Sequence, residues 1–72
     1  MNFSEKLLSF LNKRYKEKIS FNDKIFLIIE LDSFELVKLI SDIEEKLKKK
    51  YRPKNIIEFE NLNIKKFSKL FK

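Results

Sequence analysis

Apolar side chains recur every three to four residues near the start of the chain, a spacing that places them on one face of an α-helix. The residues of this stripe, with Phe10 alongside, are Phe3, Leu7, Leu8, Leu11 and Tyr15. Asn2 or Ser4 can cap the helix, because a short polar side chain accepts a hydrogen bond from a free N–H of the first turn. The pattern predicts an amphipathic helix over residues 4–16.

The helical period is lost between residues 17 and 31. Residues 19–23 have the composition of a turn, and residues 25–29 form an unbroken apolar run that could be a buried strand. A single strand without a partner would leave its backbone groups unpaired. We therefore expect a long loop in this region, held to the core by its apolar side chains.

The clearest pattern begins at Asp32, which stands three residues before Glu35 as a capping box and predicts a helix over residues 33–49. At 100° per residue, five apolar residues share one face, which we expect to be the core face: Leu36, Leu39, Ile40, Ile43 and Leu47. The residues outside this face include Phe34, Val37, Ser41, Glu44 and Glu45. An apolar pair bordered by carboxylates suits contact with a partner protein, although single exposed apolar residues are also common.

The last third of the chain predicts two further helical segments. A short turn of helix is expected at about residues 55–60, and a final helix over residues 64–71, capped by Asn63. Four residues of the final helix are expected to face inward: Ile64, Phe67, Leu70 and Phe71. Residues 1–72 thus predict one all-α domain, a small antiparallel helical bundle of three major helices plus a short third helix, with a long loop between helices one and two.

The composition narrows the chemistry that this domain can perform. The chain has no Cys and no His, which excludes disulfides, thiolate nucleophiles, most zinc sites and histidine-based triads. We expect neither an independent enzyme nor a metal site, so any chemistry must use hydroxyls, carboxylates, amines or an attached group. No apolar stretch approaches the roughly 18 residues of a membrane span, and we expect a soluble cytoplasmic protein.

The charge is unevenly distributed. The net charge is +6, yet residues 30–47 carry −4 while residues 48–72 carry +7. The basic third supports an alternative interpretation, a binding module for nucleic acid or an anionic surface in which Asp32 and Ser33 only cap a helix. Its candidate residues are Lys48, Lys49, Lys50, Arg52, Lys54, Lys65, Lys66, Lys69 and Lys72. With two Arg and no nucleic-acid-binding motif, we do not expect nucleic acid to be the partner.

Three ordered stretches of the chain resemble a known family. Ile19-Ser20, then Ile25-Phe26, then residues 29–34 (Ile-Glu-Leu-Asp-Ser-Phe) follow, without a gap, a family loop with an Ile-Thr turn, a Leu-Phe pair and a Leu-Gly-x-Asp-Ser-Leu box. The helix that follows matches at Val37, Leu39-Ile40, Ile43-Glu44-Glu45 and Leu47. Over nearly 30 consecutive positions, the chain resembles the acyl carrier proteins, including their peptidyl and D-alanyl carrier relatives.

The resemblance implies that Ser33 is the attachment site of a 4′-phosphopantetheine arm from coenzyme A, with Asp32 as the adjacent acid. The arm's thiol would hold an acyl or aminoacyl group as a thioester. The implied partners are a phosphopantetheinyl transferase and the enzymes that load and unload the cargo, for a monomeric, non-catalytic carrier. The implied docking residues are Phe34, Glu35, Val37, Ser41, Glu44 and Glu45.

Several positions depart from the family pattern. Glu30 stands where the family usually has Gly, so a left-handed backbone there would be strained. Lys38 replaces a position that is commonly Glu, and Leu27 is apolar where the family is often polar. Carriers for fatty acids, polyketides, amino acids and D-alanine share the Asp-Ser box, so the cargo stays open.

Overall fold

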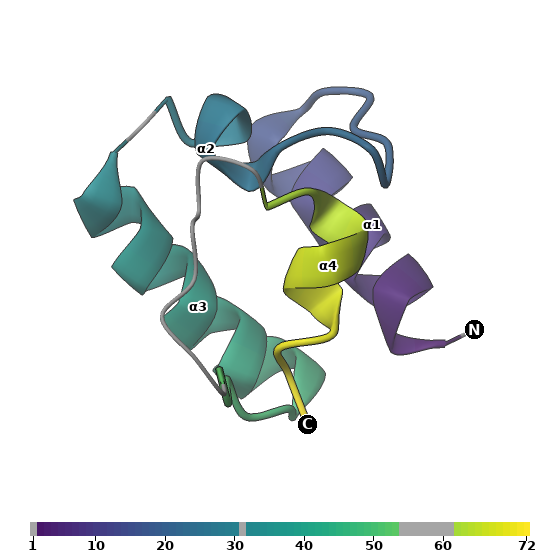
Figure 1. Cartoon of the computed structure of the whole chain (residues 1–72), viewed down its shortest axis with the longest axis vertical. Coiled ribbons are helices and arrows are strands. Elements are labelled where there is room, and N and C mark those ends of the chain that lie inside the picture. The colour runs from purple at the N-terminus through teal and green to yellow at the C-terminus, as the bar shows by residue number, and fades with distance from the viewer. Residues whose placement is uncertain (1, 31, 54–61) are drawn as a thin grey trace.

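A computed structural model describes residues 2–30, 32–53 and 62–72 of the chain. These residues contain four helices in the order α1 (Phe3–Tyr15), α2 (Ile25–Ile28), α3 (Ser33–Leu47) and α4 (Ile64–Ser68). Helix α1 packs against both α4 and α3. Figure 1 shows α4 lying in front of α1. The all-α class expected from the sequence is confirmed for this part of the chain. None of its helices is long and apolar enough to cross a membrane.

Helix α1 forms where its apolar period predicts it. The side chain of Asn2 accepts a hydrogen bond from the backbone N–H of Glu5 (2.9 Å), so Asn2 is the cap. The Ser4 hydroxyl instead lies 2.9 Å from the hydroxyl of Ser68, which links α1 to α4. Leu7 and Leu11 are fully buried, which confirms the predicted core face.

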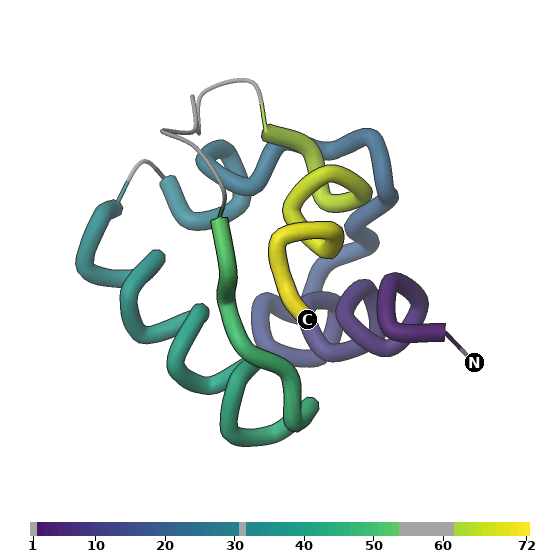
Figure 2. Tube along the Cα trace, turned by 60° about the horizontal axis from the view of Figure 1, so that its bottom comes forward, coloured from purple at the N-terminus to yellow at the C-terminus, as the bar shows by residue number. Residues whose placement is uncertain are grey.

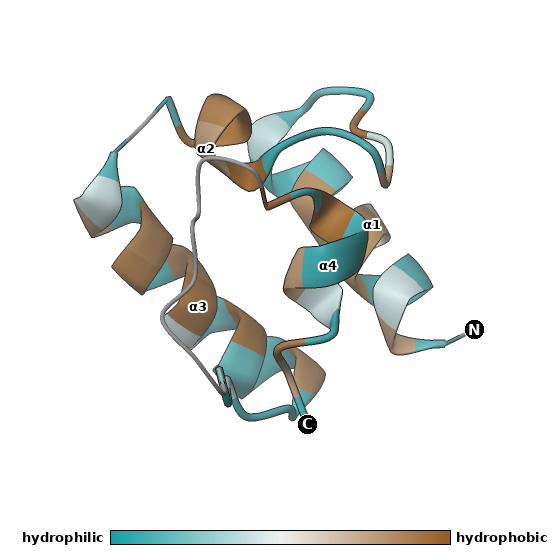
Figure 3. Ribbon diagram, viewed as in Figure 1, coloured by the Kyte–Doolittle hydropathy of each residue, from teal (hydrophilic) through white to brown (hydrophobic). Residues whose placement is uncertain are grey.

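The prediction of a loop over residues 17–31 is wrong at α2, because the apolar run forms a short helix there. The backbone N–H of Ile29 donates to the carbonyl of Ile25 (3.1 Å), so the run pairs its backbone groups locally without a second strand. Although α2 is hydrophobic throughout (Figure 3), Ile25 and Ile29 are buried while Leu27 is 70% exposed. The two buried residues are four apart, and residues four apart share one face of a helix.

Helix α3 ends two residues before its predicted end, at Leu47, because Lys48 adopts a left-handed conformation. Leu36, Leu39 and Ile43 are buried, and Ile40 and Leu47 pack partly buried against the core, as the sequence predicts.

Helix α4 also ends earlier than expected, at Ser68 instead of residue 71. The cap is Asn63, as predicted, and its side chain accepts from the N–H of Lys66 (2.9 Å). After the helix, the chain pairs with the segment that follows α3: Lys50 and Lys72 exchange two backbone hydrogen bonds of 2.8 Å. Figure 2 shows these two segments side by side. The helical turn expected at residues 55–60 lies outside the described residues.

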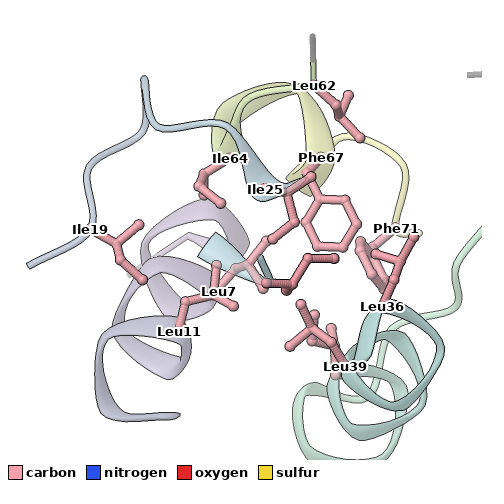
Figure 4. Packing of buried hydrophobic residues seen from close by; sticks show 12 residues of the cluster. Leu7, Leu11, Ile19, Ile25, Leu36, Leu39, Leu62, Ile64, Phe67 and Phe71 are labelled. Atoms are coloured by element: carbon pink, nitrogen blue, oxygen red, sulfur yellow. The ribbon is translucent and has the colours of Figure 1, made fainter. Parts of the chain in front are cut away.

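The core is a single cluster to which all four helices contribute (Figure 4). Its fully buried residues include Leu7, Leu11, Ile25, Leu39, Ile43, Ile64 and Phe67. Phe67 and Phe71 meet edge to face with ring centroids 5.2 Å apart, and Tyr51 lies 5.3 Å from Phe71. Leu70, predicted to face inward, is partly buried against this cluster. The core therefore fixes which face of α3 is buried and which stays exposed.

Candidate functional site around Ser33

Ser33 is the first residue of α3 and its side chain is exposed. Asp32 caps the helix: its Oδ1 accepts from the backbone N–H of Phe34 (2.9 Å) and of Glu35 (3.3 Å). The Ser33 hydroxyl makes no hydrogen bond with any residue that the structure describes, and neither does its backbone N–H. Capping is therefore carried out by Asp32, and the neighbouring hydroxyl is left accessible.

The reciprocal half of the predicted capping box does not form. In a complete box, the acid at the third position accepts from the N–H of the capping residue. Here the N–H of Asp32 donates to the carbonyl of Ile29 (3.1 Å), and the Glu35 carboxylate points to the end of α1. The difference arises because α1 offers two better donors, which a sequence pattern within one helix does not reveal.

These donors are Tyr15 and Arg14. The Tyr15 hydroxyl donates to Glu35 Oε2 (2.6 Å), and the Arg14 guanidinium lies 3.3 Å from the same oxygen. Arg14 also forms an ion pair with Asp42, two turns further along α3. The hydrogen bond from Tyr15 lowers the pKa of Glu35, with Arg14 adding to the effect. Burial, with the bond to Glu35, raises the pKa of Tyr15 to about 12. At neutral pH the carboxylate is charged and the phenol keeps its proton.

Glu30, which stands where the family usually has Gly, adopts a left-handed backbone conformation with φ of 55°. A side chain in this conformation crowds the backbone, which is why glycine is the usual residue there. The loop before Ser33 thus has a glycine-like bend without a glycine, in the conformation expected from the sequence to be strained.

The predicted docking residues fall into two groups. Phe34 and Val37 are 83% and 67% exposed, and Ser41 and Glu45 are also exposed, so these four face solvent. Glu35 and Glu44 are partly buried and bonded within the chain, since Glu44 accepts from the backbone N–H of Tyr51 (2.9 Å). Their carboxylates are therefore engaged in holding the fold.

Sequence reasoning did not select Leu27, Arg14 or Tyr15 as functional residues. Together with Phe34 and Val37, Leu27 is one of three large apolar side chains that are exposed in the described residues. An apolar residue at a position that is often polar in the family was the sequence feature that could have identified it. Arg14 and Tyr15 carried no signal of this kind, because they precede Glu35 by about 20 residues and reach it only through the packing of α1 on α3.

Lys48, Lys49 and Lys50 follow the C-terminal end of α3, away from Ser33, whereas Lys65 and Lys66 lie in α4. Lys54 lies outside the described residues. Lys50 and Lys72 sit directly opposite each other in the backbone pairing. Neither forms an ion pair with an acid among the residues described here.

Comparison with known proteins returns no match among family models, curated proteins or solved structures. A functional conclusion therefore rests on the geometry around Ser33 and on the sequence resemblance.

Proposed function

We propose that this chain is a carrier protein that holds an acyl or aminoacyl group as a thioester on a 4′-phosphopantetheine arm at Ser33. The observation that carries the proposal is the separation of roles at the start of α3: Asp32 makes both capping bonds, and Ser33 keeps an exposed hydroxyl free of described partners. If Ser33 served only as the helix cap, its own hydroxyl oxygen would accept the hydrogen bonds from those N–H groups. The resemblance over residues 19–47 adds the expectation that this hydroxyl is modified.

The residues around Ser33 suit an attached phosphodiester. The serine hydroxyl is the group that would form the phosphoester bond, and no described side chain covers it. The N–H of Ser33, which has no partner among the described residues, and the positive end of the α3 dipole favour a negative charge at this position. When bound, the arm supplies a thiol on a flexible tether, a group that the chain lacks because it has no Cys.

The exposed apolar residues suit contact with partner enzymes. Phe34 and Val37 lie on the first two turns of α3, and Leu27 lies on α2, which precedes Ser33 in the chain. Apolar side chains at a transient interface lose water contact when a partner covers them, which favours binding. Under this proposal, Leu27 joins Phe34 and Val37 in the surface that partners contact on approaching Ser33.

The direct test is intact-mass spectrometry after incubation with coenzyme A and a broad-specificity phosphopantetheinyl transferase. The wild-type chain should gain the mass of one phosphopantetheine, and Ser33→Ala should gain none because the acceptor oxygen is absent. Ser20→Ala is the matched control: it removes an exposed hydroxyl upstream of α2 and should leave the gain intact. No gain in the wild type, or an equal gain in Ser33→Ala, would falsify the proposal.

A further inference from the structure

The first turn of α3 has little attachment to the core. Asp32, Ser33 and Phe34 are exposed, and the first buried residue of the helix is Leu36. Glu35 is the side chain of this turn that bonds to another helix, through Tyr15 and Arg14. A terminal turn whose leading residues are exposed frays easily, so the contacts of Glu35 add to the Asp32 cap in setting how often it is formed.

Arg14 holds α3 at two points on one face. Glu35 and Asp42 are seven residues apart, which at 100° per residue places them within about 20° of each other around the helix axis. Ser33 is two residues before Glu35 and therefore points about 200° away from it. The bonds from Arg14 and Tyr15 to Glu35, with the ion pair between Arg14 and Asp42, fix how α3 is rotated about its own axis. In this rotation Ser33 faces away from α1 and towards solvent.

We propose that Arg14 and Tyr15 are positioning residues, which hold the first turn of α3 in the rotation that presents Ser33 to the enzyme that modifies it. The inference rests on the proposed function of Ser33. It assigns Glu35 the role of an internal anchor instead of a docking contact.

The strength of these contacts is sufficient for such a role. Exposed ion pairs contribute little, but the 2.6 Å bond from the Tyr15 hydroxyl to a charged carboxylate belongs to the stronger class of hydrogen bonds. Without it, part of the population would have a frayed first turn, and a modifying enzyme would bind only the formed fraction. The Michaelis constant should then rise while kcat stays the same, because the bound complex is unchanged.

The chain offers matched controls, since it contains only two tyrosines and two arginines. Tyr15→Phe removes the bond to Glu35, whereas Tyr51→Phe removes a hydroxyl that has no hydrogen bond to the described residues. Arg14→Lys replaces the guanidinium that pairs with Glu35 and Asp42 at the same time by a single ammonium group. Arg52→Lys makes the same change at an exposed position.

The experiment measures steady-state kinetics of the transferase on each variant, at a temperature at which thermal melts show every variant fully folded. Tyr15→Phe should lower kcat/KM by at most about fivefold, the limit set by one net hydrogen bond, and the whole change should be in KM. Tyr51→Phe and Arg52→Lys should match the wild type. Amide hydrogen exchange at Phe34 and Glu35, whose N–H groups bond to Asp32, should be faster in Tyr15→Phe and Arg14→Lys alone.

A double variant separates positioning from direct contact with the enzyme. If Tyr15 acts through Glu35, Tyr15→Phe has no further effect in a Glu35→Ala background. An undiminished effect in that background, or equal kinetics for Tyr15→Phe and Tyr51→Phe, overturns the inference while modification of the wild type still supports the carrier function. A wild-type chain that is never modified overturns the proposed function itself.

Discussion

At the scale of single residues, left-handed backbone positions stand out in a chain that has no glycine. Lys16 and Lys48 adopt this conformation where α1 and α3 end, and Glu30 adopts it three residues before Ser33. Such positions favour glycine, because a Cβ atom there crowds the neighbouring carbonyl at a cost of about 1–2 kcal/mol. Each of these helix ends and the bend before Ser33 therefore carries local strain that the rest of the fold offsets.

The strain at Glu30 predicts a stabilising substitution. Glu30→Gly should raise the free energy of unfolding by about 0.5 to 1 kcal/mol, the steric gain less the greater flexibility of glycine in the unfolded chain. Urea denaturation monitored by circular dichroism measures the change. Glu17→Gly is the control, since it makes the same change at an exposed residue without a left-handed backbone, and it should not stabilise. Equal effects of the two substitutions would show that the strain at Glu30 has no energetic consequence.

At the scale of elements, α3 carries out two tasks on separate faces. Leu36, Leu39 and Ile43 bind it to the core, and Phe34 and Val37 leave an apolar surface beside Ser33. The remaining face is held by α1 through Glu35 and Asp42. Because Phe34 and Val37 lie away from both the core contacts and the contacts with α1, the exposed face can be altered without loss of the fold.

Substitution of Val37 tests this division of faces. Val37→Asp should lower the rate of phosphopantetheinylation by about five- to tenfold, the loss of one substantial apolar contact with the enzyme. Circular dichroism should show unchanged helical content, because the side chain is 67% exposed. Val37→Lys should act in the same direction, since it removes the same apolar contact. Melting of the helix in both variants would instead identify Val37 as part of the core.

At the scale of the whole molecule, one small core must hold every element. Phe67 is fully buried and its ring meets those of Tyr51 and Phe71, so it joins α4 to the segments after α3 and α4. A domain of this size has a total stability of roughly 4 to 10 kcal/mol. The loss of a single central aromatic ring is therefore a large fraction of what keeps the chain folded.

Two phenylalanine substitutions compare the core with the surface. Phe67→Ala should cost about 3 to 5 kcal/mol and bring the chain close to unfolding at room temperature. Phe34→Ala makes the identical change at a side chain that is 83% exposed and should alter stability by less than about 0.5 kcal/mol. Thermal melts followed by circular dichroism measure both. A comparable loss of stability in the two variants would contradict the core described above.

Much of the fold follows from local patterns in the chain. The spacing of apolar residues and the caps Asn2, Asp32 and Asn63 predict where α1, α3 and α4 begin. The helix ends are less predictable, because Lys48 replaces the usual glycine signal and residues 70–72 leave α4 to pair with residues 50–52. Helix α2 is missed because an unbroken apolar run has no period from which a helix can be recognised.

By itself, the sequence determined that Ser33 stands beside a capping acid at the start of a helix and that Phe34 and Val37 lie off its core face. Both depend on neighbours within a few residues, where helical geometry fixes the relation. Tertiary structure alone decided that Glu35 turns to Tyr15 and Arg14, that Leu27 stays exposed, and that the Ser33 hydroxyl is left without a described partner. These depend on which helices pack together, because contacts between residues about 20 positions apart arise only when the core forms.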